Sequence, residues 1–129
     1  MEEKRDKTLY QRLGGYDVIA GIIDDLYARM RSDPKLQRFS AGRSVDSKNR
    51  ARQLFVDQIC ALSGGPCIYI GRDMKTSHAG LGITESEWNV TMQYTAAALE
   101  KFNIQAKEKE EFLGIFERYR EDIIEENLH

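Results

Sequence analysis

The sequence predicts an all-α fold, and three features of this chain of 129 residues support that prediction. Over long segments the apolar residues recur every three or four positions, which is the spacing of one face of a helix. The run Thr84-Glu85-Ser86-Glu87 matches a capping box, a signal with which helices begin. No segment alternates convincingly between polar and apolar residues and no internal repeat is found, so neither a sheet nor a repeat architecture is expected.

The composition fits one compact domain over residues 1–129, in which residues 1–7 form a mobile N-terminal extension. Hydrophobic residues make up 41% and charged residues 31%, and the formal net charge is -2. This charge provides no broad basic surface to bind nucleic acid or an anionic membrane. Neither a membrane-spanning run nor a secretory signal is found. We therefore expect a cytoplasmic protein that is a monomer or a weak dimer.

The first half of the chain predicts two helices joined by a glycine turn. A short apolar face over residues 9–13 stops at Gly14-Gly15, which forms a flexible elbow. Asp17 is expected to cap the next helix, whose apolar residues keep helical spacing as far as Met30. Ser32-Asp33-Pro34 ends that helix and can start another short turn, because proline is tolerated at a helix start but not inside a helix.

The second half predicts three more helices and one irregular segment. Gly64-Gly65-Pro66 interrupts the apolar spacing and must end a helix. We expect a helix over about residues 46–62, a structured loop over residues 67–71, a helix from Thr84 to near Asn103 and a last helix from about Ala106 to Ile123.

The two cysteines, Cys60 and Cys67, lie on either side of the glycine break. Their spacing fits neither a zinc ligand set nor a Cys-x-x-Cys redox motif. Cys60 is most simply interpreted as a small buried hydrophobe. A disulfide between the two is the alternative, which a reducing compartment disfavours.

His78 is the only histidine inside the chain, and it follows Met74 by four residues. Residues four apart project from the same face of a helix, so the imidazole and the thioether would lie side by side. Neutral imidazole binds iron well, and an unbranched side chain such as methionine packs beside a flat macrocycle. The pair would suit a histidine that binds heme iron, but a lone histidine in a small protein more often lies at the surface or is hydrogen-bonded in the core.

Several short motifs follow one another along residues 8–116 in a specific order and spacing. They are Thr8-Leu9-Tyr10 with Leu13-Gly14-Gly15, Asp25-Leu26-Tyr27, Gly64-Gly65-Pro66 with Tyr69 and Gly71, and Met74 with His78, Leu81, Ile83 and Thr84. Together these motifs resemble the truncated hemoglobins, most closely the group I (N-type) branch. The resemblance implies a globin fold trimmed to a two-over-two sandwich of helices, with heme b as the cofactor.

The resemblance also implies which residues bind the heme, with His78 as the proximal ligand to the iron. Apolar positions at helical spacing are also those of an ordinary core, and exposed helix charges can simply be solvated. The implied heme-binding residues are Met74, Leu81, Ile83 and Trp88 along the apolar wall, Phe39, Phe55 and Tyr69 elsewhere around the porphyrin, and Arg72 and Lys75 as partners of the propionates.

On the distal side, the resemblance gives Tyr27 the role of donating its O–H to bound O2 and slowing its loss. Its hydroxyl could instead bond a backbone carbonyl or water. Gln58 is the preferred second donor, because a carboxamide on a buried stripe needs a partner. That partner could also be the backbone or Tyr27.

The spacing between Ala41 and Pro66 fits the family in more than one register. No histidine lies in this segment to close the sixth coordination position, so open or water-bound iron is expected. The competing distal candidates are Ala51, Gln53, Leu54 and Phe55, besides Gln58, and either Phe39 or Ser40 takes the heme-packing position at the preceding turn.

The resemblance implies a globin that binds O2 reversibly, along with NO and CO, for oxygen binding or transport. The same site could act as an NO dioxygenase that forms nitrate, if an external electron donor or reductase returned the iron to the ferrous state. The fold does not separate carrier from enzyme. Two rival hypotheses are a heme-free helical interaction module and a heme sensor, although no signalling segment is attached.

Overall fold

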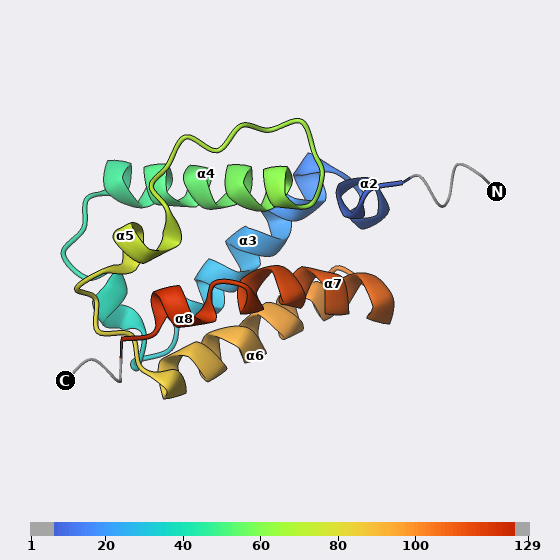
Figure 1. Cartoon of the computed structure of the whole chain (residues 1–129). Coiled ribbons are helices and arrows are strands. Elements are labelled where there is room, and N and C mark those ends of the chain that lie inside the picture. Colours follow the sequence, from blue (N-terminus) through green and yellow to red (C-terminus); the bar gives the residue numbers. More distant parts are fainter. Residues whose placement is uncertain (1–6, 126–129) are drawn as a thin grey trace.

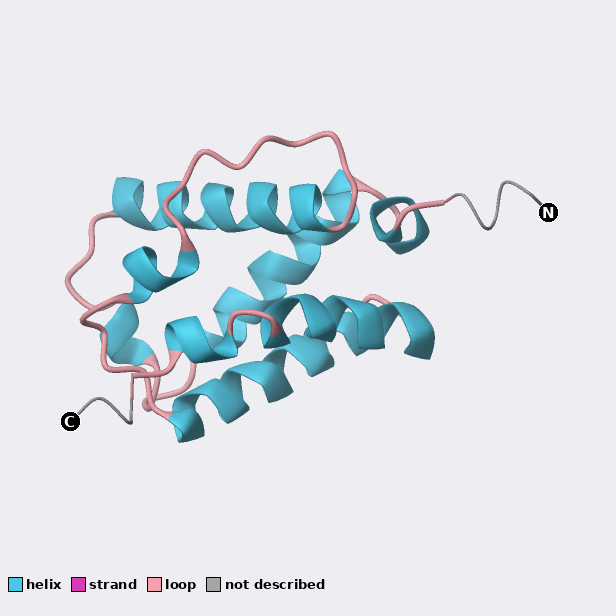
Figure 2. Cartoon of the chain, in the orientation of Figure 1, coloured by secondary structure: helices cyan, strands magenta, loops and turns pink. Residues whose placement is uncertain are grey.

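The computed structural model describes residues 7–125, and every regular element in that range is a helix (Figure 2). The all-α prediction is therefore confirmed for this part of the chain, while the expected N-terminal extension lies outside it except for Lys7. None of these helices is long and apolar enough to cross a membrane. The α-helices are α2 (Leu9–Leu13), α3 (Tyr16–Arg31), α4 (Val45–Leu62), α5 (Met74–His78), α6 (Glu85–Lys101), α7 (Ala106–Glu117) and α8 (Arg120–Ile123), and a 3-10 turn, η1, covers Gln37–Phe39.

Hydroxyl side chains begin three of the helices. The Thr84 hydroxyl accepts from the Glu87 amide over 3.1 Å, and the Glu87 carboxylate accepts from the Thr84 amide over 3.0 Å. This reciprocal pair is the predicted capping box of α6. Thr8 forms the same motif with Gln11 at α2, and the Ser44 hydroxyl caps α4. These bonds satisfy amides that have no partner inside their helix.

The turn between α2 and α3 shifts the start of α3. Gly14 and Gly15 have φ values of 114° and 92°, a region that favours glycine. They allow α3 to begin at Tyr16, with Gly15 at the cap position. The prediction that Asp17 caps this helix was wrong, because its side chain already lies in the first helical turn, where a negative charge still favours the helix dipole.

The segment after Ala106 forms two helices, so the prediction of one last helix was wrong. α7 ends at Glu117, and the chain turns at Arg118 and Tyr119 before α8. This break redirects the chain so that α8 packs against α5, the helix that carries His78. Apolar spacing continues across such a short break, and the sequence pattern therefore did not reveal it.

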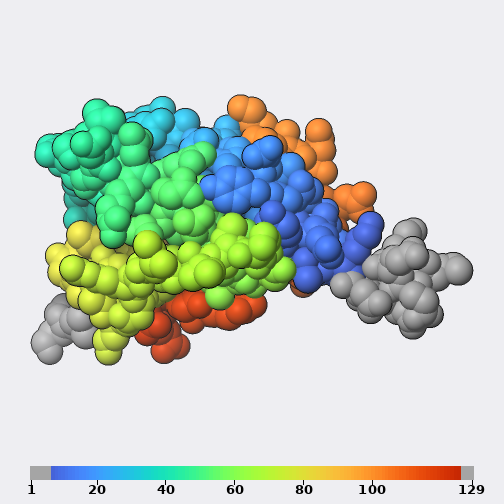
Figure 3. Space-filling view, turned by 90° about the horizontal axis from the view of Figure 1, so that it is seen from above, coloured from blue at the N-terminus to red at the C-terminus, as the bar shows by residue number. Residues whose placement is uncertain are grey.

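Two pairs of helices form the layers of the molecule (Figure 1). α3 packs against both α4 and α6, and α6 packs against α7, so that α3 and α4 lie over α6 and α7. α5 and α8 lie together at one end of these layers, and α2 contacts α3 and α7 at the other. The segment of residues 63–78 covers the surface between α4 and the C-terminal helices (Figure 3).

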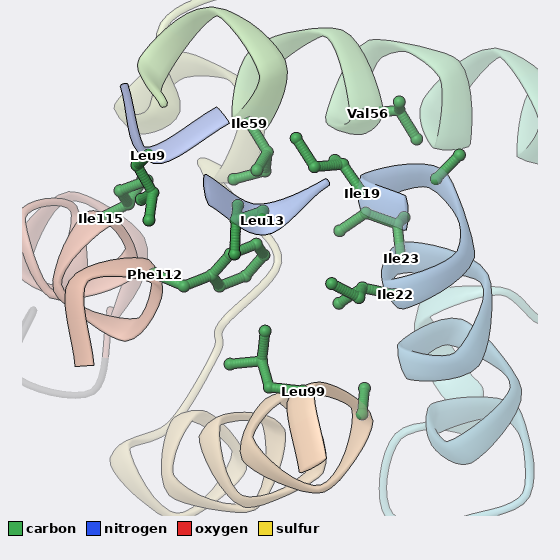
Figure 4. Close-up of a cluster of buried hydrophobic side chains, with 12 residues drawn as sticks. Leu9, Leu13, Ile19, Ile22, Ile23, Val56, Ile59, Leu99, Phe112 and Ile115 are labelled. Carbon is green, nitrogen blue, oxygen red and sulfur yellow. The ribbon is translucent and has the colours of Figure 1, made fainter. Parts of the chain in front are cut away.

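The hydrophobic core lies toward the α2 end of the layers (Figure 4). Phe112 of α7 is fully buried there and contacts aliphatic side chains from the other helices. In α3 the first turns face this core, which leaves the later turns for a different environment. The labelled core residues are Leu9, Leu13, Ile19, Ile22, Ile23, Val56, Ile59, Leu99, Phe112 and Ile115.

Cys60 and Cys67 form a disulfide, with their Cα atoms 5.7 Å apart. The interpretation of Cys60 as an unpaired hydrophobe was therefore wrong, although the residue is indeed buried. Gly64 has φ 94°, and the Gly65 amide donates to the Cys60 carbonyl over 2.8 Å. This tight turn folds the chain back over the end of α4 and brings the two sulfurs together. Spacing alone did not reveal the turn.

We expect the substitution Cys67→Ser to lower the free energy of unfolding by about 2 kcal/mol, because the cross-link restricts the unfolded chain. Urea denaturation without reductant should show the variant unfolding at a lower urea concentration than the wild type. With reductant present, the two proteins should unfold together. Equal midpoints in the absence of reductant would contradict a stabilising disulfide.

Candidate functional site

A cavity of about 850 Å³ lies between the two helix layers on the side of α5 and α8. Cavities of roughly 300–1,000 Å³ are usual for small molecules and cofactors. Arg72 and Lys75 are exposed and lie outside its lining. The other predicted site residues all line it: Tyr27, Phe39, Phe55, Gln58, Tyr69, Met74, His78, Leu81, Ile83 and Trp88.

His78 lies at the end of the five-residue helix α5, in the wall of the cavity. Its Nδ1 atom is 2.9 Å from the Met74 carbonyl oxygen and 2.9 Å from the Ser77 hydroxyl. A carbonyl can only accept, so this contact assigns the proton to Nδ1 and leaves the lone pair of a neutral imidazole on Nε2. The residue therefore presents one nitrogen for a metal while the other fixes the ring.

The loop before α5 is held by Tyr69, whose hydroxyl donates to the Arg72 carbonyl. A Cβ atom at Gly71 would collide with the ring and hydroxyl of Tyr69, so a larger residue there would displace this ring. The motif Tyr69-x-Gly71 thus closes the turn that leads into α5. Tyr69 also lines the cavity.

Tyr27 comes from the later turns of α3 and faces the cavity. Its ring lies 5.8 Å from that of Phe55, measured between centroids, on the opposing helix α4. Within residues 7–125 its hydroxyl has no hydrogen-bond partner. Burial raises the pKa of Tyr27 to about 12. The phenol therefore keeps its proton at neutral pH and remains available as a donor.

This buried phenol should make the stability of the apoprotein fall as pH rises from about 10 to about 12. The ordinary tyrosine pKa is 10.0, so the unfolded chain loses its proton first and the folded chain holds more protons in this range. Rising pH therefore favours unfolding. Urea denaturation at several pH values should show a weaker dependence in Tyr27→Phe, and an unchanged dependence would show that Tyr27 does not cause it.

One side of α4, which includes Gln58, faces the cavity. Ala51, Leu54, Phe55 and Gln58 line it, whereas Gln53 is exposed. The Gln53 amide instead donates to the Tyr16 hydroxyl over 2.7 Å and to Asp57 over 3.0 Å. In the described chain the Gln58 carboxamide forms no hydrogen bond, either to the backbone or to Tyr27.

Four cations in the lining were not predicted from the sequence: Arg31, Arg43, Lys48 and Arg52. Arg43 donates to the Ser47 hydroxyl over 2.8 Å, which holds its guanidinium at the start of α4. Lys48 lies one turn further along and is exposed. Charged residues near a helix start usually face solvent, and the sequence carried no signal that this side of α4 borders the cavity.

The C-terminal helices supply a second part of the lining that the sequence did not indicate as functional. Phe116 lies 5.7 Å from Phe55 and 5.7 Å from Phe112, measured between ring centroids. Tyr119, in the turn after α7, and Ile123, in α8, continue the wall. The available signal was the apolar stripe itself, which does not distinguish core from cavity.

The residues present fit a heme group. The lining is largely aromatic and aliphatic, as a flat macrocycle requires, and one imidazole in it has an unused nitrogen. The polar side chains of Tyr27 and Gln58 lack partners among the described residues and line the same space. Both side chains are partly buried and their polar atoms border the open space of the cavity, where a bound ligand would supply hydrogen-bond partners.

Comparison with known proteins connects this cavity to one family. A family profile described as "Bacterial-like globin" matches residues 8–125. The group 1 truncated hemoglobin GlbN of Mycolicibacterium paratuberculosis is 30% identical over 107 residues, which cover 83% of this chain and 76% of the relative. The group 1 truncated hemoglobin GlbN of a Nostoc species is 28% identical over 101 residues, which cover 78% of this chain and 83% of the relative.

Solved structures show the same arrangement of helices. The Fe(III) form of the truncated hemoglobin from Tetrahymena pyriformis superposes with a TM-score of 0.82 at 22% identity, covering 92% of this chain and 98% of that one. The 2/2 hemoglobin from Synechococcus, in the cyanomet state and with covalently attached heme, gives a TM-score of 0.81 at 20% identity, with the same coverage of 92% and 98%.

Proposed function

Because this chain belongs to the bacterial-like globins and is a group 1 truncated hemoglobin with a two-over-two fold, we propose that it binds O2 reversibly, along with NO and CO, at a heme held by His78. Heme b is the cofactor of these globins, and its ferrous iron supplies a coordination position that diatomic gases occupy reversibly. Family membership argues against the heme-free interaction module.

The observation that carries the proposal is the orientation of His78. Its Nδ1–H is bonded to the Met74 carbonyl, and the opposite ring nitrogen remains free in a residue that lines the cavity. Such a hydrogen bond fixes the ring and raises the basicity of the ligating nitrogen. His78 would therefore bind the iron through Nε2, with its imidazole ring held in one orientation and one tautomer.

Tyr27 and Gln58 are the proposed donors to the gas. When bound at the heme, O2 is polarised and would accept a hydrogen bond more readily than bound CO, and in a water-poor cavity that bond is stronger than in water. Tyr27 keeps its proton because burial raises its pKa, and Gln58 can donate through its amide. Both side chains line the cavity, so they favour retention of O2.

The aromatic wall of Phe55, Phe116 and Trp88 has the role of excluding water. Trp88 is buried, and the two phenylalanine rings contact each other across α4 and α7. A dry wall strengthens the hydrogen bond that Tyr27 offers and limits side reactions with solvent. This packing supports reversible binding.

The direct test is the absorption spectrum of the protein purified from cells, followed by titration of the heme-free chain with hemin. We expect one heme to bind per chain, and the reduced protein to bind O2 and release it when O2 is removed. A chain that takes up no stoichiometric heme would refute the proposal. Irreversible oxidation on first exposure to O2 would refute the carrier role specifically.

A second candidate function is the conversion of NO and O2 to nitrate. Arg43 and Lys48 line the same cavity, and these cations would favour an anionic product. The reaction joins both oxygen atoms of O2 to NO and consumes one electron, so sustained turnover requires an external electron donor or reductase. Nitrate formed in proportion to NO consumed, over several turnovers with a reductant, would support it. If nitrate formed in a single turnover only, the dioxygenase function would be refuted and O2 carriage would remain the proposed function.

A further inference from the structure

The turn of residues 79–83 follows His78 directly and joins α5 to α6. Gly80 and Gly82 have φ values of 83° and 63°, which glycine adopts without strain. Between and after them, Leu81 and Ile83 line the cavity. This turn therefore sets both the end of α5 and part of the cavity wall.

Glu125, at the end of the described chain, forms hydrogen bonds to the backbone of this turn. Its carboxylate accepts from the Gly80 amide over 2.9 Å and from the Gly82 amide over 2.6 Å. Its own amide donates to the Ile83 carbonyl over 2.9 Å. The bonds from Gly80 and Gly82 lower the pKa of the Glu125 carboxyl, so it is ionised at neutral pH.

Arg38, in η1, binds the carbonyl groups of the same turn. Its guanidinium donates to the Leu81 carbonyl over 2.8 Å and to the Gly82 carbonyl over 3.2 Å. It also forms an ion pair of 2.8 Å with Glu87, which completes the capping box of α6. The guanidinium lies 4.1 Å from the ring centroid of Phe39, which lines the cavity. Arg38 thus joins three walls of the cavity.

α5 depends on such external contacts for its position. An isolated helix of five residues is not stable in water, because its few internal hydrogen bonds do not offset the cost of nucleation. At the start of α5 the chain is held by Tyr69 and the nearby disulfide. At its end the backbone donors and acceptors of the turn are taken up by Glu125 and Arg38.

We propose that Arg38 and Glu125 are positioning residues that clamp the turn of residues 79–83 from two sides and thereby fix the orientation of His78 toward the heme. This inference rests on the proposed heme function. The Glu125 carboxylate accepts from the amides of the turn and the Arg38 guanidinium donates to its carbonyls, so the turn is held in one conformation. Without the clamp, the His78 ring samples several orientations and releases heme more readily.

The test compares Glu125→Gln and Arg38→Met with the matched controls Glu121→Gln and Arg50→Met. The control side chains are exposed and form no hydrogen bond in the described chain. Two properties of the heme-loaded protein are measured: the iron–histidine stretching band of the ferrous form by resonance Raman, and the rate of heme transfer to an excess of a heme-free acceptor globin. Amide hydrogen exchange at Gly80 and Gly82 is measured as a third, in the apoprotein.

We expect each clamp variant to lose heme about tenfold faster than wild type, with a shifted or broadened stretching band and faster exchange at the two glycines. Both controls should match wild type in all three measurements. Arg38→Lys keeps the charge but not the fork of donors, and it should fall between wild type and Arg38→Met. These substitutions at the surface remove no core contacts, and circular dichroism verifies the fold.

The inference would be overturned if both clamp variants matched wild type in the rate of heme loss, the stretching band and the exchange at the two glycines. The proposed function would then stay intact. A lower melting temperature with an unchanged stretching band would make the two residues merely structural, which also overturns it. Failure of the wild-type chain itself to bind heme would instead refute the proposed function.

Discussion

Replacing His78 with alanine is expected to abolish tight one-to-one binding of hemin and to remove the absorption bands of an imidazole-ligated heme. The imidazole is fixed by the Met74 carbonyl and presents its second nitrogen in the cavity wall. Loss of an outer partner of a metal ligand typically costs about 10- to 100-fold in metal affinity, and loss of the ligand itself should cost more. Hemin titration followed by absorbance measures both effects.

Two variants make this result specific. Thr76→Ala changes the same short helix at an exposed position outside the cavity lining and should leave hemin binding unchanged. His78→Gly should regain the imidazole-ligated spectrum when free imidazole is added, because the small molecule replaces the missing ring. An alanine variant that kept the wild-type spectrum and affinity would show that another side chain holds the iron.

Replacing Tyr27 with phenylalanine is expected to speed O2 dissociation about tenfold to hundredfold. A hydrogen bond to a charged or strongly polar acceptor contributes about 1.5–3 kcal/mol, and each 1.4 kcal/mol is about a tenfold change in an equilibrium constant. CO is a weaker acceptor, so its dissociation should change much less. The measurement is replacement of O2 by CO in a stopped-flow instrument.

Tyr16→Phe is the matched control for this variant. It removes a hydroxyl from the same helix, but Tyr16 bonds Gln53 and lies outside the cavity lining. Its O2 dissociation rate should equal that of wild type. If Tyr27→Phe also matched wild type, Gln58 would become the principal donor and Gln58→Leu would be expected to show the larger change.

Much of the fold could be predicted because its signals are local. The capping box of Thr84 and Glu87 depends on residues three apart, and the glycine turn at Gly14 and Gly15 depends on backbone freedom at those positions. Both features could be predicted from residues that are close together in the sequence. The break at Tyr119 could not be predicted in this way. It allows α8 to pack against α5, and these two helices are far apart in the sequence.

The candidate site divides in a similar way. His78 and Met74 lie on one turn of helix, and the spacing of four residues sufficed to pair them. Gln53 and Gln58 looked alike in the sequence, and only the packing of α4 against α3 turns one to the surface and the other to the cavity. For this reason the sequence alone did not show which face of α4 lines the cavity.

By itself, the sequence determined the helical class, most helix starts, the iron-ligand candidate and, through its motifs, the family. Only the tertiary structure decided which cations line the cavity, namely Arg31, Arg43, Lys48 and Arg52, and that Cys60 meets Cys67. It also brought Glu125 to the turn after His78. The physical reason is that capping and helical spacing act within one turn of chain, whereas the wall of a cavity is made by segments that meet only after the helices pack.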